Sequence, residues 1–167
     1  MTESKWLDQY SGESAEQLIA LADEYRIDSI LAAFEQALQQ KASRDGEKSL
    51  SAEEGILLAV EALEREVNNG GYSQFFINSS VEYVSQIVAS LRRIGCSKTS
   101  EITERAIAAL GLPVMNALAI QNAMADDNDE REDELGQCDD LYYNSDEDIE
   151  GRLFAFIRAN HAAFELS

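Results

Sequence analysis

Residue types that commonly build catalytic and metal sites are scarce in this sequence, which has one histidine, two cysteines and one proline among 167 residues. A single histidine excludes metal sites with two histidine ligands, and a histidine-based catalytic triad would have to use His161. Cys96 and Cys138 are too few for a disulfide framework, so we expect two free thiols. The sequence also lacks a phosphate-binding loop, a dinucleotide fingerprint and a nucleophile elbow. We expect no cofactor and no enzyme. A small-molecule enzyme is the third hypothesis, since the residue types would allow a paired-carboxylate hydrolase, but the sequence names no substrate for it.

Long apolar runs are missing as well. The longest weakly polar stretch, residues 106–120, is interrupted by Gly111, Pro113 and Asn116 and falls short of the roughly 20 residues that span a bilayer. The first residues contain no apolar segment of the kind that a secretory signal needs. We therefore expect a cytoplasmic protein that does not enter a membrane.

Basic residues are outnumbered, since 13 lysines and arginines stand against 32 acidic residues and the formal net charge is −19 at pH 7. Direct binding to nucleic acid or to an anionic membrane is disfavoured, because their phosphates would be repelled. Hydrophobic residues make up 45% of the chain, which is enough for a sizeable core. The expected partner is therefore a basic protein.

Hydrophobic residues recur with helical spacing through most of the chain. Residues 28–41 carry Ile30, Phe34 and Leu38 on one face, and residues 84–94 show a similar stripe that ends at Gly95. Capping boxes that begin at Ser14 and Ser51 predict the starts of two further helices.

Three more helices are predicted toward the carboxyl end. One covers residues 97–110, the next has Pro113 in its first turn and continues toward residue 124, and the last presents an apolar face that extends to Phe164. No segment alternates convincingly with the period of a strand. We predict an all-α protein, a single compact domain over residues 1–167 with about eight helices and short turns.

The excess negative charge is concentrated in residues 126–150, which hold 13 acids and one base. If this segment were mostly helical, it would span about 37 Å and carry one net charge per roughly 3 Å. One strand of B-DNA carries a phosphate every ~3.4 Å. A solvated linker is the ordinary explanation for such a segment, although Leu135, Leu141, Tyr142 and Tyr143 could anchor it to the core. The candidate phosphate-mimicking residues are Asp126, Asp127, Asp129, Glu130, Glu132, Asp133, Glu134, Asp139, Asp140, Asp146, Glu147, Asp148 and Glu150.

Part of the same segment suggests calcium as the alternative. Asp146, Asp148, Glu150 and Gly151 match the first half of an EF-hand loop, with oxygen ligands at alternate positions and a glycine at the sixth. The twelfth position, which should be a bidentate glutamate, is Ile157. A calcium-dependent interaction module that uses residues 146–151 is therefore the second hypothesis.

A further motif lies between residues 66 and 79, where an Asn-Gly-Gly turn is followed by an aromatic residue and then by Gln-Phe-Phe-x-Asn. This motif resembles the signature of the DMP19-like family, and the acidic, helical character of the chain is similar to that family as well. We expect the motif to be structural, with its glycines in a tight turn, its phenylalanines packed beneath and its Asn and Gln side chains bonded to backbone groups. Its residues are Asn68, Asn69, Gly70, Gly71, Tyr72, Gln74, Phe75, Phe76 and Asn78.

The resemblance implies an acidic helical homodimer that imitates duplex DNA. Such a protein would occupy the DNA-binding face of a dimeric helix-turn-helix transcription factor and relieve its repression. The charge concentrated in residues 126–150 supports this hypothesis independently of the resemblance. The sequence alone leaves open which carboxylates share a face and where a dimer interface would lie.

Overall fold

The computed structural model describes residues 3–167 and confirms the all-α prediction. These residues form nine α-helices and four short 3₁₀ helices, with no named strand and one isolated backbone bridge between Lys5 and Tyr25. The chain divides into two compact units, which we call unit 1 (residues 3–61 and 148–167) and unit 2 (residues 62–147). Whether they act as the single domain that the sequence suggests stays a prediction.

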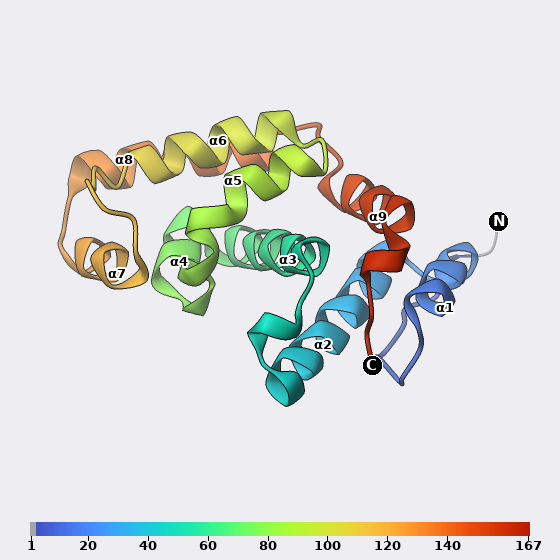
Figure 1. The fold of residues 1–167 in the computed structure, drawn as a ribbon. Helices are drawn as coiled ribbons and strands as arrows, with labels where there is room; N and C mark the ends of the chain where they lie inside the picture. Colours follow the sequence, from blue (N-terminus) through green and yellow to red (C-terminus); the bar gives the residue numbers. More distant parts are fainter. Residues whose placement is uncertain (1–2) are drawn as a thin grey trace. The chain divides into compact units, whose positions relative to one another are not determined.

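Unit 1 is built around the long helix α2 (Figure 1). It contains α1 (Ala15–Ala20), α2 (Ile27–Asp45), the first part of α3 (Ala52–Gly70) and α9 (Ile149–Ala159), and α2 packs against both α1 and α9. Leu18, Ile30 and Phe34 are fully buried in this unit. Phe164 packs edge-on against Phe34, with ring centroids 5.8 Å apart.

Unit 2 holds the acidic segment and the Asn-Gly-Gly motif. It contains the end of α3, then α4 (Tyr72–Ile77), α5 (Val84–Arg93), α6 (Ser97–Ala108), α7 (Ala117–Ala125) and α8 (Asp129–Tyr143). Helix α6 packs against α5 and α8, and α7 packs against α4 (Figure 1). Apolar side chains of α3, α4 and α5 supply about half of its buried hydrophobic residues.

Local sequence signals placed several helix starts correctly. The Ser14 hydroxyl accepts the N–H of Gln17 and the Gln17 side chain accepts the N–H of Ser14, so the first capping box is complete. Ser51 and Glu54 make the same pair of bonds at 3.0 Å and 2.8 Å, at the start of α3.

Two local predictions were wrong. Pro113 does not begin a helix, because Asn116 caps α7 through a bond from the Ala119 N–H to its side chain, and residues 111–116 are irregular. Phe164 is buried but lies beyond the end of α9. The assumption that residues 126–150 are mostly helical holds, since α8 covers Asp129–Tyr143 and α9 begins at Ile149, with a short irregular stretch between the two helices.

Two other findings bear on the first expectations. Cys96 and Cys138 are both buried and form no disulfide, as predicted. Among residues 3–167 the structure contains no helix with the length and apolar character needed to cross a bilayer.

A buried ion pair joins three segments of unit 1. Lys41 Nζ lies 3.0 Å and 3.2 Å from the two carboxylate oxygens of Glu54, and the Glu54 side chain is only 1% exposed. Lys41 also donates to the Glu165 carbonyl at 2.7 Å, and Glu54 accepts the Glu165 N–H at 3.1 Å. The pair therefore binds the end of the chain to α2 and α3.

Removing the Glu54 charge should destabilise the protein strongly. In Glu54→Gln the Lys41 ammonium stays buried without a counter-charge, which typically costs about 3–5 kcal/mol. Urea unfolding followed by circular dichroism would measure the change, with Glu47→Gln as an exposed glutamate control. Equal stability of the two variants would contradict the role assigned to the pair.

Candidate functional site

Helix α8 has a buried face and an acidic outer face. It begins after Asn128, whose side chain accepts the Arg131 N–H at 2.9 Å. Acidic residues in the first turn suit the positive end of the helix dipole. The buried residues Arg131, Leu135, Cys138 and Tyr142 are spaced by four, three and four, so they share one face. This face fixes the orientation of the helix.

The carboxylates of Asp129, Asp133 and Asp140 lie on the opposite side, which we call the acidic stripe. All three are exposed, and none forms an ion pair within the described residues. At about 1.5 Å per residue, the first two are about 6 Å apart along the axis and the last two are about 10.5 Å apart. These separations correspond to about two and three phosphate steps of a DNA strand.

Further free carboxylates surround the stripe. Glu130 and Glu132 flank it on α8, and Asp126 and Asp127 precede the helix; all four are exposed and without an ion pair in the part of the chain described here. Arg131 is the one base of α8, but it points inward and donates to the Asp126 carbonyl at 2.5 Å. The helix therefore has a net charge of −6 over about 22 Å. This density, about 4 Å per charge, is close to that expected from the sequence.

Glu134 has a different role, because it is paired with Arg105 of α6. The guanidinium makes two bonds to this carboxylate and a third to Gln137 Oε1 at 2.8 Å. The bond from Arg105 holds the pKa of Glu134 below its ordinary value. This ion pair joins α8 to α6 and neutralises Glu134.

Asp139 is engaged with the Asn-Gly-Gly motif. Its Oδ1 accepts the N–H of Tyr72 at 2.8 Å, at the start of α4. Partial burial raises the pKa of this carboxyl, and the bond from Tyr72 opposes the rise. Gly71 has φ +81°, and a Cβ atom there would lie 2.3 Å from Asp139 Oδ2. A glycine at position 71 therefore permits both the turn and the close approach of α8.

The aromatic residues of the motif lie in the core of unit 2. Tyr72, Phe75 and Phe76 are fully buried, and the Tyr72 hydroxyl is 2.8 Å from Thr103 Oγ1 of α6. Burial raises the pKa of the Tyr72 phenol above its ordinary value. Tyr143 contributes from α8, since its hydroxyl donates to the Val67 carbonyl.

The amide side chains of the motif do not behave as predicted. Asn78 donates to Glu66 Oε2 at 2.7 Å and to Gln74 Oε1 at 3.2 Å, so both bonds go to side chains rather than to backbone groups. Asn68 and Asn69 are exposed near the end of α3 and make no side-chain hydrogen bond among the described residues. The helix also continues through Gly70, and the turn occurs at Gly71.

The loop after α8 uses its carboxylates to begin the neighbouring helices. Glu147 accepts the N–H groups of Lys98 and Thr99 at 3.1 Å and 2.9 Å, at the start of α6. Asp146 lies 2.5 Å from Lys98 Nζ. Asp148 caps α9 by accepting the Gly151 N–H at 3.0 Å.

These contacts leave the calcium hypothesis without a ligand set. In residues 3–167, no three histidine, cysteine or acidic side chains lie where they could hold a metal ion together. Glu150 belongs to unit 1, where burial and the nearby Asp28 carboxylate raise its pKa.

The structure thus separates the 13 predicted acids into two groups and Glu150, which lies apart from them in unit 1. Seven free carboxylates surround or form the acidic stripe, namely Asp126, Asp127, Asp129, Glu130, Glu132, Asp133 and Asp140. Five others bind within the protein, namely Glu134, Asp139, Asp146, Glu147 and Asp148. The four residues expected to anchor the segment to the core differ in burial. Leu135 and Tyr142 are buried, whereas Leu141 and Tyr143 are about half exposed.

Comparison with known proteins matches residues 48–160 to the family described as DMP19-like protein. The match covers the Asn-Gly-Gly motif and the whole of α8. No curated protein matches the chain.

Substitution of Gly71 should test the contact between the motif and α8. In Gly71→Ala the methyl group would meet Asp139, and alanine would have to adopt a positive φ. We therefore expect the free energy of unfolding to fall by more than about 1 kcal/mol. Gly136→Ala is the matched control, because it is exposed within α8 with open space around it and should stabilise by up to about 1 kcal/mol. Urea unfolding of both variants distinguishes the two effects, and similar changes at both positions would contradict this account.

Proposed function

The chain belongs to the DMP19-like protein family, and from this premise we propose that it is a DNA mimic. In this proposal the carboxylates of α8 take the place of phosphates on the DNA-binding face of a helix-turn-helix transcription factor, and so keep that factor from its operator. The observation that supports this proposal most directly is the acidic stripe, where Asp129, Asp133 and Asp140 point outward and form no ion pair among the described residues.

A DNA-binding surface recognises the negative charges of the phosphates. Its arginines and lysines gain affinity by making charge-assisted hydrogen bonds and releasing counterions from an anionic ligand. A helix that presents free carboxylates about 6 Å and 10.5 Å apart along its axis offers the same kind of gain. Since the opposite face of α8 is buried, the free carboxylates keep their positions without help from a partner.

We also propose that the protein acts as a homodimer in the cytoplasm, so that two arrays face a dimeric regulator. Support comes from α7, whose outward residues Ala117, Leu118, Gln121, Asn122 and Ala125 are exposed and uncharged. Residues 106–125 carry no charge in a chain with a net charge of −19. Two such chains can approach through this surface with the least repulsion.

The proposed activity needs no chemistry on a substrate. The regulator is displaced by binding alone, so the function does not require a catalytic residue or a cofactor.

A gel-shift competition tests the mimicry. Purified dimeric helix-turn-helix repressors, each bound to its labelled operator, are titrated with the protein, and release of DNA from at least one is expected. Replacing Asp129, Asp133 and Asp140 by asparagine should weaken the competition and reduce its salt slope by about one per carboxylate.

The control is a variant with the same net charge, Asp8→Asn, Glu16→Gln and Glu47→Gln, whose changes are exposed in unit 1. It should compete like the original protein. Failure to release DNA from any repressor would overturn the proposal of DNA mimicry. An equal loss of competition in both variants would show that the acidic stripe is not its cause.

The dimer is tested by size-exclusion chromatography with light scattering. Leu118 is 68% exposed, and Leu118→Asp should give a monomer because a charge is added to the uncharged surface. Leu141→Asp adds the same charge on α8 and should leave the dimer intact. A monomeric original protein would contradict the proposal.

A further inference from the structure

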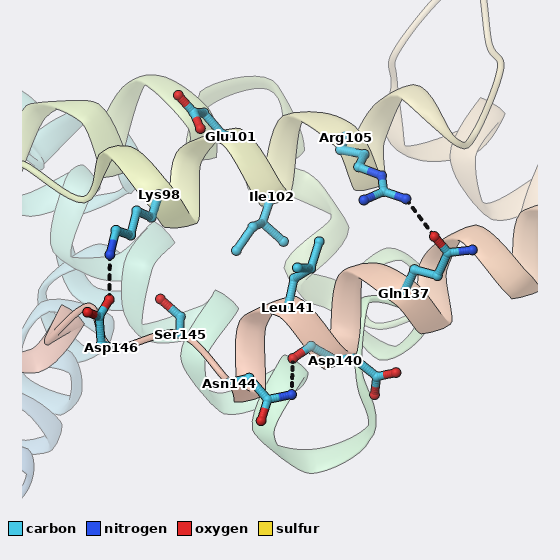
Figure 2. Close-up of a pocket in the computed structure, with 10 residues that line it drawn as sticks. All are labelled: Lys98, Glu101, Ile102, Arg105, Gln137, Asp140, Leu141, Asn144, Ser145 and Asp146. Carbon is cyan, nitrogen blue, oxygen red and sulfur yellow. Dashed lines mark hydrogen bonds and ion pairs between the residues drawn. The ribbon is translucent and has the colours of Figure 1, made fainter.

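A groove of about 760 Å³ lies between α6 and α8. Figure 2 shows Ile102 and Leu141 pointing toward each other from the two helices, with polar side chains on both sides of them. Asp140 lines this groove and is also the last member of the acidic stripe. The groove is therefore continuous with the surface proposed to bind the regulator.

Leu141 is an exposed apolar residue on an acidic helix. Its side chain is 45% exposed on a helix whose other outward residues are largely acidic. Contact with a partner would remove this apolar surface from water.

The charges around the groove indicate what kind of partner would fit. Its two cations are already paired, Lys98 with Asp146 and Arg105 with Glu134. Glu101 and Asp140 remain, and neither forms an ion pair among the described residues. The groove thus combines an apolar centre with free negative charge, which complements an apolar side chain surrounded by lysine or arginine.

We propose that the groove imitates the base edges of DNA, and that it receives an apolar side chain from the basic surface of the same regulator. In the major groove such a side chain contacts the methyl group of thymine, beside base atoms that donate and accept hydrogen bonds. Ile102 and Leu141 supply the apolar contact, and the amides of Gln137 and Asn144 lie beside them (Figure 2). The inference rests on the proposed function and adds a source of selectivity to it.

Selectivity is needed because carboxylates alone attract any basic surface. Counterion release depends on the number of charges and is strongly weakened by salt. Burial of an apolar side chain depends on shape and is affected little by moderate salt. The two contributions can therefore be measured separately.

The experiment uses two synthetic helical peptides of equal positive charge, which differ by leucine or alanine at the centre of the basic face. Binding is followed by fluorescence anisotropy at salt concentrations from about 50 to 200 mM. The leucine peptide should bind the original protein about tenfold more tightly at every salt concentration. Leu141→Ala should reduce this ratio to near one without changing the salt slope.

Ile27→Ala is the matched control, since it truncates a partly exposed apolar side chain in unit 1 and should keep the ratio. Circular dichroism establishes that both variants are folded. Equal binding of the two peptides, or an unchanged ratio of their affinities in Leu141→Ala, would overturn the proposal that the groove imitates base edges. Either result would leave the proposed function of the acidic stripe unaffected. Failure of both peptides to bind at low salt would instead count against the proposed function.

Discussion

Mutual repulsion within α8 is the constraint around which unit 2 is organised. The helix carries seven acids and one base, so its charges oppose both its compactness and its attachment to other acidic surfaces. Burial of Leu135, Cys138 and Tyr142 offsets this repulsion on one face. Polar contacts to α4 and α6 fix the orientation of the helix, because each holds one point of it. The outward carboxylates are thereby held at defined spacings.

The family motif and the acidic helix are parts of one arrangement. Gly71 lets the chain turn from α3 into α4 and leaves space for the Asp139 carboxylate. Tyr72 then donates its N–H to Asp139, and its ring makes a T-shaped contact with Tyr142, with centroids 6.0 Å apart. A motif that first suggested only a turn is thus part of the support for the surface that we propose to be functional.

The helices were largely predictable from the sequence. Which acidic residues are free and which bind within the protein was not. Apolar spacing and capping boxes are local signals, and they placed α2, α5 and the starts of α1 and α3. The start of α7 was missed because an Asn116 cap outweighed the proline signal. Glu134 and Asp139 look like their neighbours in sequence, and only partners 29 and 67 residues away distinguish them. The contacts of Arg105 and the position of Leu141 in the groove likewise depend on the packing of α6 against α8, which leaves no local pattern in the sequence.

The position of Cys138 has a practical consequence for the motion of α8. Its thiol faces inward, and burial raises its pKa, so the reactive thiolate is rare while the helix is docked. Modification by a thiol reagent requires the helix to open first. The rate at which Cys138 is labelled therefore measures how often the acidic surface detaches from the molecule that supports it.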